Sequence, residues 1–279
     1  MAKNLENFSA SANADTPSSW STLRWHGGFI FASVHREFQL RYRNSVLGAS
    51  WTILNPLAMM LVYTLIFSQV MQVRLPGLDS AYAYSIFLLC GLLPWGLLTD
   101  IVTRGPTLFL DQANLLKKIQ FPKISLLVIA VLSSLVNFAI IFSLFILFLV
   151  ISGKFPGWII VAMVPVVLLQ ICLAASLCLI LGILHVFFRD VAPLTNIALQ
   201  FAFWLTPIVY SIKMVPEKFH DYLALNPLAP LFDAYHAIFI GQHAPQWSSL
   251  ISTGLLTALL CGSAVYLYKR RSSEIVDEL

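Results

Sequence analysis

Six long apolar runs dominate the sequence, and Asp100 is the only Asp, Glu, Lys or Arg residue inside them. A charged side chain at the centre of a bilayer costs about 2.5–3.5 kcal/mol, so runs this poor in charge are suited to hydrocarbon. The sequence therefore predicts an all-α integral membrane protein with six transmembrane helices. We expect the spans at residues 46–70, 84–102, 124–151, 158–188, 194–210 and 250–268.

The composition indicates one membrane unit and gives no sign of a nucleic-acid, metal or cofactor site. Hydrophobic residues make up 58% of the chain and charged residues 11%, against roughly 25% charge in soluble domains. The net charge of +4 is not gathered into a basic stripe with interleaved aromatic residues, so we expect no nucleic-acid partner. The four cysteines lack C-x-x-C spacing, and the outer His and Asp residues match no common ligand pattern.

The distribution of Lys and Arg predicts that both termini are cytoplasmic. With that orientation, 13 of the 17 basic residues fall in inside segments and 4 in outside segments. Cytoplasmic loops carry an excess of Lys and Arg, so this split agrees with an even number of spans. We divide the chain into a disordered cytoplasmic tail (1–19), an amphipathic helix (20–44), the six-span domain (45–271) and a cytoplasmic C-terminal tail (272–279).

Residues 20–44 have the periodicity of an amphipathic helix. Apolar residues recur every three or four positions, and arginines lie on another face. This pattern is typical of a helix in the plane of the lipid headgroups, although an ordinary helix packed on its own protein has the same pattern. The candidate interface residues are Phe31, Val34, Arg36, Phe38, Arg41, Tyr42 and Arg43.

The longest inside loop, 103–123, has a helix-forming centre between Gly105-Pro106 and Phe121-Pro122. A short helix that is both apolar and basic is typical of a contact for a cytosolic partner, but also of a helix resting on lipid, and the pattern favours neither. The candidate residues are Leu110, Asn114, Leu115, Leu116, Lys117, Lys118, Ile119 and Phe121.

The longest outside segment, 211–247, contains the pentapeptide LNPLA at 225–229, which also occurs at 54–58. Asn followed by Pro is a common helix start, so we expect the first span to begin its main part at Pro56 after a lead-in segment. By the same rule a helix should cover 227–240. This helix is too short to span a membrane and should be re-entrant or lie at the outer interface.

The sequence lacks the motifs of an enzyme. It has no G-x-x-x-x-G-K-[ST], G-x-S-x-G or H-E-x-x-H, so we expect no ATP hydrolysis by this chain. Asp100 and Arg104, four residues apart, should pair with each other. A membrane enzyme of glycolipid assembly stays an alternative function, and it would need Asp100, His185 or Asp190 as catalytic groups. An ion-coupled carrier is a second alternative, which the scarcity of buried charge disfavours.

Aromatic and amide side chains are the groups in the spans that could contact a cargo. Sugars stack their C–H faces on aromatic rings, and their hydroxyls bond uncharged amides such as Gln170 and Asn196. Each aromatic residue could instead serve in helix packing or an interfacial belt. The candidate path residues are Trp51, Tyr63, Phe67, Tyr84, Trp95, Trp204 and Tyr210.

A series of short motifs resembles one family in order along residues 30–270. The motifs are Arg41-Tyr42-Arg43, Leu54-Asn55-Pro56-Leu57, Gly91-Leu92-Leu93-Pro94-Trp95, Ala113-Asn114-Leu115-Leu116-Lys117-Lys118, Phe121-Pro122-Lys123, Phe188-Arg189-Asp190-Val191, Thr206-Pro207-Ile208-Val209-Tyr210 and Leu225-Asn226-Pro227-Leu228. Each is weak alone, but the ordered set is specific. The chain resembles the permease subunit of polysaccharide-exporting ABC transporters of the ABC-2 type.

This resemblance implies a homodimer in the bacterial inner membrane, with each copy resting on a cytosolic ATPase subunit. The implied cargo is undecaprenyl-linked O-antigen or a related glycan, such as capsule or teichoic acid. The family's interface helix would fall within 20–43, its coupling helix within 110–121 and its re-entrant outer gate, a helix pair, within 211–242. The residues expected at that gate are Asn226, Pro227, Phe232 and Asp233.

Overall fold

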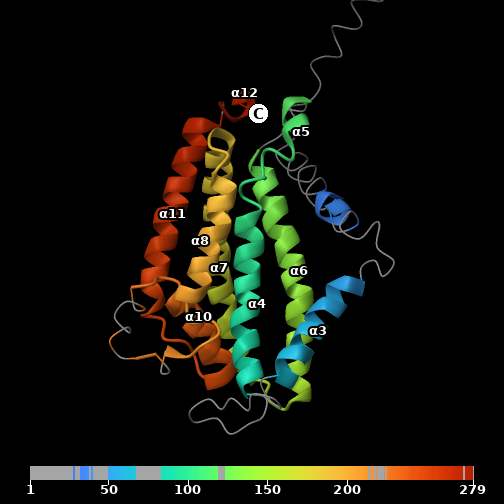
Figure 1. The fold of residues 1–279 in the computed structure, drawn as a ribbon, viewed down its shortest axis with the longest axis vertical. Helices are drawn as coiled ribbons and strands as arrows, with labels where there is room; N and C mark the ends of the chain where they lie inside the picture. The colour runs from blue at the N-terminus through green and yellow to red at the C-terminus, as the bar shows by residue number, and fades with distance from the viewer. Residues whose placement is uncertain are drawn as a thin grey trace, which may run out of the picture.

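The computed structural model describes residues 28, 32–37, 39, 50–66, 83–118, 123–212, 215, 216, 218, 223, 225–272 and 274–278. Within these ranges the regular elements are helices and none is a strand, which confirms the all-α class. Four helices of this part are long and apolar enough to cross a membrane. They lie side by side in Figure 1 and are α4 (Ala83–Thr103), α6 (Ile124–Ile151), α7 (Met163–Phe187), which continues the short helix η4 (Gly157–Ala162), and α11 (Leu250–Arg271).

These four helices match the second, third, fourth and sixth predicted spans. The fifth corresponds to α8 (Val191–Leu205), which has 15 residues and ends five residues earlier than expected. It ends there because Thr206 takes an extended conformation, with φ −100° and ψ 133°, as residues before a proline commonly do. Since residues 67–82 lie outside the described part, the total of six spans stays a prediction.

The first predicted span contains α3 (Trp51–Leu65). The prediction that its main helix begins at Pro56 is wrong, because α3 starts five residues earlier and includes Pro56. The apolar run continues on both sides of this proline, and Pro56 removes only one backbone donor from the helix. Pro94 is likewise inside α4, which runs unbroken through it.

The core lies between α4 and α7. In the most apolar window of each helix, 67% of the α4 residues and 50% of the α7 residues are buried, against 22% for α6 and for α11. All four helices are apolar around their whole circumference, and such helices are stable with an exposed apolar side only when lipid or another chain covers it. The helices α6 and α11 therefore form the periphery of the single chain.

Two glycines bring the backbones of α4 and α7 together at one end of the bundle. A Cβ atom added to Gly105, just after α4, would lie 2.7 Å from the carbonyl oxygen of Cys178. A Cβ atom added to Gly182 of α7 would lie 2.9 Å from the carbonyl oxygen of Gly105. Since real Cβ atoms do not approach so closely, any larger residue at either position would push the two elements apart.

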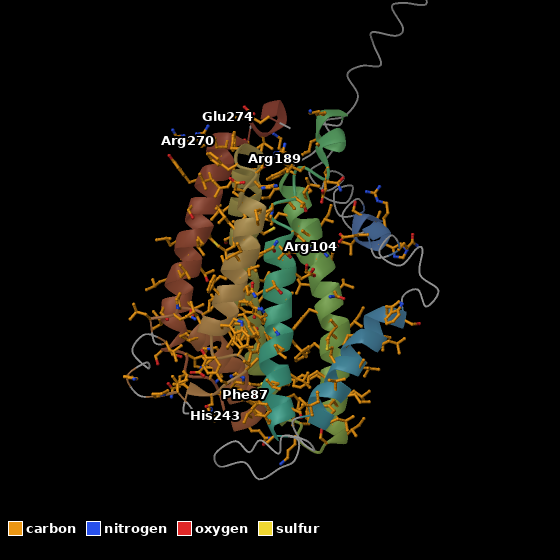
Figure 2. All side chains as sticks on the ribbon, in the orientation of Figure 1. Phe87, Arg104, Arg189, His243, Arg270 and Glu274 are labelled. Atoms are coloured by element: carbon orange, nitrogen blue, oxygen red, sulfur yellow. The ribbon has the colours of Figure 1, made fainter. Side chains whose placement is uncertain are left out.

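Short elements cap the two ends of the bundle (Figure 1). At one end lie α5 (Ala113–Lys118) and α12 (Glu274–Glu278), and at the other lie α10 (Ala229–His236) and the π-helical turn η7 (Ala237–Gly241). Figure 2 places Arg104, Arg189 and Arg270 toward the first end, and Phe87 and His243 toward the second. Following the predicted orientation, we name these the inner and the outer end.

The turn between α6 and η4 forms a tight hairpin. Gly153 and Gly157 both have positive φ, 66° and 65°, a conformation that side chains disfavour. The amides of Gly153 and Lys154 bond the carbonyls of Val150 and Leu149, at 3.1 and 2.9 Å, which closes the end of α6. The chain can therefore reverse within a few residues at the outer end.

Candidate functional site

The candidate coupling residues lie in and around α5, which follows the inner end of α4. Leu116 is buried, with 8% of its surface exposed, and Lys117 points to solvent. Residues 104–112 form turns, and the Leu116 amide donates to the Gln112 carbonyl at 2.9 Å. Within the loop 103–123, the helix α5 therefore covers only Ala113–Lys118. Leu110 is half-buried, whereas the side chains of Asn114, Leu115 and Lys118, and all of Ile119 and Phe121, lie outside the described residues.

Residues 32–37, within the range predicted for the interface helix, are helical. Val34 is half-buried and Arg36 is exposed, which agrees with an apolar and a basic face. The other candidates on this helix lie outside the described residues, namely Phe31, Phe38, Arg41, Tyr42 and Arg43.

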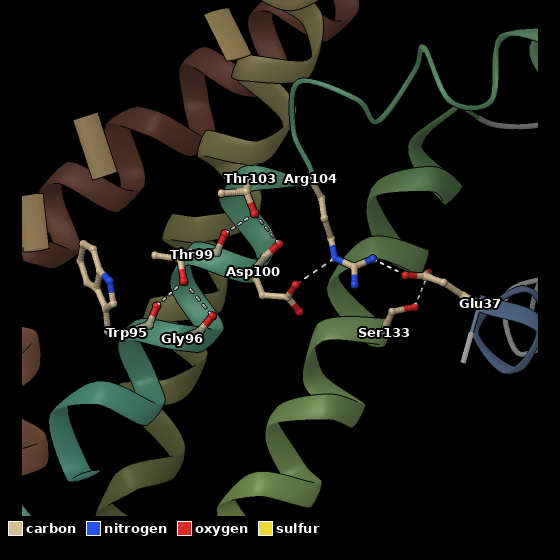
Figure 3. Close-up of polar contacts among 8 residues, drawn as sticks. All are labelled: Glu37, Trp95, Gly96, Thr99, Asp100, Thr103, Arg104 and Ser133. Carbon is tan, nitrogen blue, oxygen red and sulfur yellow. Dashed lines mark hydrogen bonds and ion pairs between the residues drawn. The ribbon is translucent and has the colours of Figure 1, made fainter. Parts of the chain in front are cut away.

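An ionic cluster joins this helix to α4 and α6 (Figure 3). Arg104 Nε donates to Asp100 Oδ1 at 3.4 Å, which confirms the predicted pair. Arg104 Nη1 also donates to Glu37 Oε1, and Ser133 Oγ donates to Glu37 Oε2 at 2.7 Å. Burial lowers the pKa of Arg104, but the charges of Asp100 and Glu37 outweigh it, so the pKa is raised and the guanidinium stays charged. Glu37 thus ties the interface helix to two spans.

A cavity of about 300 Å³ lies beside this cluster. Arg36 and Glu37 of the interface helix line it together with Arg104 and Asp111 of the inner segment. These four side chains carry no net formal charge. The interface helix and the segment leading to α5 thus line one common cavity.

The outer segment is fixed to the bundle through Asn226. Its Oδ1 accepts a hydrogen bond from the Leu228 amide at 2.9 Å, and its Nδ2 donates to the Leu205 carbonyl and the Thr206 hydroxyl, at 3.1 and 2.9 Å. Thr253 Oγ1 of α11 donates to the Pro227 carbonyl at 2.5 Å. The segment before α10 is thereby held to the end of α8 and the start of α11.

The helix predicted over 227–240 is present as α10 followed by η7. Of its expected gate residues, Phe232 is fully buried and Asp233 is exposed. The His236 ring packs against α4, and burial lowers its pKa to about 4 despite an opposing contact with the Phe87 carbonyl. Within the described part of the chain, no three His, Cys, Asp or Glu side chains are grouped as metal ligands.

Residues 29–240, from the interface helix to η7, match the family described as ABC-2 type transporter. The chain belongs to this family.

Individual relatives agree with the assignment to the ABC-2 type transporters. The chain is 32% identical over 259 residues to the O-antigen export system permease protein RfbA of Myxococcus xanthus. The aligned region covers 92% of this chain and 97% of that protein. It is 27% identical over 261 residues to a protein of the same name from Klebsiella pneumoniae, covering 91% and 98%. It is 22% identical over 244 residues to the polysialic acid transport protein KpsM of Escherichia coli, covering 86% and 92%.

The structure of this ABC-2 type chain distributes the candidate path residues over different surroundings. Trp95 is buried, with its ring centroid 5.6 Å from that of Phe203 and 5.9 Å from that of Phe232. Trp51 and Trp204 are 48% and 61% exposed. Within one chain these three residues do not line a common wall. The Tyr84 and Tyr210 hydroxyls donate to the carbonyls of Val209 and Trp204, at 3.0 and 2.9 Å, whereas the Tyr63 side chain and Phe67 lie outside the described residues.

Gln170 of this ABC-2 type chain, which the sequence offered as a path residue, is completely buried and bonded inside the bundle. Its Nε2 donates to the Pro94 carbonyl at 2.6 Å, and its Oε1 accepts from the Tyr235 hydroxyl at 2.6 Å. A lone amide in an apolar helix indicates that some polar partner exists. The sequence could not say that the partner is Tyr235 on the outer helix.

Proposed function

We propose that this chain is the transmembrane subunit of an ATP-driven exporter that moves a lipid-linked polysaccharide across the bacterial inner membrane, with O-antigen as the cargo. Two copies form the channel as a homodimer, and each copy rests on a separate cytosolic ATPase subunit. The names of the RfbA relatives support the cargo, and their coverage of nearly the whole chain supports a shared architecture. The helices carry almost no charge that could couple transport to an ion gradient, so the driving force comes from the ATPase partner.

The observation that carries this proposal is the position of α5. This short helix lies at the inner end, separated from α4 only by the turns of 104–112. Those turns begin at Arg104, whose side chain also bonds the interface helix through Glu37. A displacement of α5 by a soluble partner can therefore reach both the core helix and the interface helix.

The proposal includes the assignment of individual residues. Coupling is assigned to Leu110, Asn114, Leu115, Leu116, Lys117, Lys118, Ile119 and Phe121, and contact with membrane lipid to the helix within 20–44. Both termini lie on the cytoplasmic side. The undecaprenyl-linked glycan passes along aromatic residues contributed by both copies, and two of these residues, Trp51 and Trp204, are exposed in the single protein chain. Asn226, Pro227, Phe232 and Asp233 belong to the outer gate.

Charge reversal on α5 tests the function. In a host that lacks its own permease but has the ATPase and the lipid-linked glycan, we expect Lys117→Glu to insert normally and to lower surface polysaccharide at least tenfold. The control is Lys154→Glu, at another exposed lysine in the outer hairpin, which should export normally. Normal export by Lys117→Glu, or glycolipid turnover by the purified chain alone, would contradict the proposal.

A further inference from the structure

The last helix, α12, lies beside α5 at the inner end of the bundle (Figure 1). It contacts both α5 and α7. The two short helices are separated by more than 150 residues of sequence, and both lie on the face to which the proposed function assigns the ATPase. This arrangement raises the question of what α12 does for α5.

Ile275 anchors α12 in the protein. It is fully buried and belongs to the same hydrophobic cluster as Leu116 of α5. The surrounding tail is short and rich in acidic residues, a composition that favours solvent unless a specific contact holds it. An isoleucine without exposed surface in such a tail shows that α12 is docked on the bundle.

Polar contacts fix both the start of α12 and the residue that precedes α6. Lys123 Nζ, just before α6, donates to the Ser272 carbonyl. Arg271 forms an ion pair with Glu274, and its guanidinium carbon lies 5.6 Å from the centroid of the Phe187 ring at the end of α7. The tail is therefore connected to the inner ends of α6, α7 and α11 at once.

We propose that α12 is a positioning element for the coupling helix, and that Ile275 is its principal residue. The helix α12 fills the space between α5 and α7, so that α5 cannot yield sideways when a partner pushes on it. A push on α5 then reaches α7 and α11 through α12, in addition to passing along the chain into α4 and α6. This inference rests on the proposed role of α5 in coupling.

Ile275→Asp tests this role, because it places a charge at the buried contact. In the purified full-length chain we expect the amides of α5, including that of Leu116, to exchange hydrogen at least fivefold faster than in the wild type. In the complex with the ATPase, we expect ATP hydrolysis to continue while polysaccharide exported per ATP falls about tenfold. Ile275→Leu, which keeps an apolar side chain of the same size, and Glu278→Lys, at an exposed position, serve as controls and should behave as wild type.

The outcomes separate this inference from the proposed function. If Ile275→Asp leaves α5 exchange and export unchanged, α12 is a solvated tail end and the inference is wrong. If Lys117→Glu also exports normally, the coupling role of α5 itself fails, whereas exchange in α5 still reports whether α12 holds it. Should Ile275→Asp not insert, Ile275→Ala gives the same comparison with a milder loss, and unchanged exchange in that variant overturns the proposal.

Discussion

The imidazole of His236 stacks on the ring of Phe87, with centroids 4.0 Å apart and ring planes 6° apart. This contact joins α10 to α4 at the outer end. His236 Nε2 also lies 3.2 Å from the Phe87 carbonyl oxygen, so the tautomer with hydrogen on Nε2 can donate to it. The ring is held in its neutral form, and acid should therefore loosen the outer helix.

Lowering the pH is expected to destabilise the protein through His236. The pKa of His236 is about 4 in the folded chain and 6.5, the ordinary value for histidine, in the unfolded chain. The unfolded chain therefore takes up the proton first as the pH falls. Stability should be full above pH 6.5 and should decline by roughly 3 kcal/mol toward pH 4. The melting temperature in detergent, recorded across this pH range, measures the effect.

The variant His236→Phe keeps an aromatic ring but cannot titrate, and should flatten the decline. His243→Phe, which changes an exposed histidine at the same end, should keep the wild-type profile. An unchanged decline in His236→Phe would show that other groups cause it.

The hydrogen bond between Gln170 and Tyr235 should appear in a double-mutant cycle. Gln170→Leu leaves the buried Tyr235 hydroxyl without this partner, and we expect a loss of about 1–3 kcal/mol. Tyr235→Phe removes the hydroxyl, so the double variant should be more stable than the sum of the single losses. Chemical denaturation of the three variants gives the coupling energy, and strict additivity would mean that the bond contributes nothing.

Two glycines on α4 provide a matched test of helix packing. A Cβ atom at Gly91 would lie 2.8 Å from the Ile208 carbonyl oxygen, whereas one at Gly96 would meet nothing within 4 Å. Gly91→Ala should therefore cost about 1–3 kcal/mol, and Gly96→Ala should be neutral or stabilising. Melting temperatures of the two variants decide this, and equal values would argue against the close approach of α4 to Ile208.

Removing the Glu37 carboxylate should release the interface helix. Glu37→Ala loses the bonds from both Arg104 and Ser133, while Arg104 keeps Asp100 as a partner. Since the pair is partly exposed, we expect a loss of about 1 kcal/mol, or roughly fivefold faster hydrogen exchange in residues 32–37. Exchange should be unchanged in Arg36→Gln, whose side chain is exposed, and equal exchange in both variants would contradict the role of Glu37.

The spans that agree best with prediction are those whose backbone could not fold otherwise in lipid. The limits of α6 were predicted to the residue, because a long apolar run without proline must bond its own backbone in hydrocarbon. The C-terminal limit of α8 was not predicted correctly. The apolar pattern continues beyond Leu205, but Thr206 is extended because Pro207 follows it, and the helix ends there.

The repeated pentapeptide shows where local rules fail. At 225–229 it precedes α10, which begins at Ala229 and not at Pro227 as predicted, and Asn226 bonds Leu205 and Thr206 of a distant segment. At 54–58 the same five residues lie inside α3. Helix starts therefore depend on partners that local sequence does not contain. The same holds for Glu37 and Arg104, which are 67 residues apart and share no pattern that could have paired them.

The close approach of Gly105 to α7 has a mechanical consequence. Backbones this close leave no space for a side chain between them, so we expect the inner halves of α4 and α7 to move together as one rigid unit. We therefore expect changes of shape to involve the elements with little buried surface, such as α3 and α8.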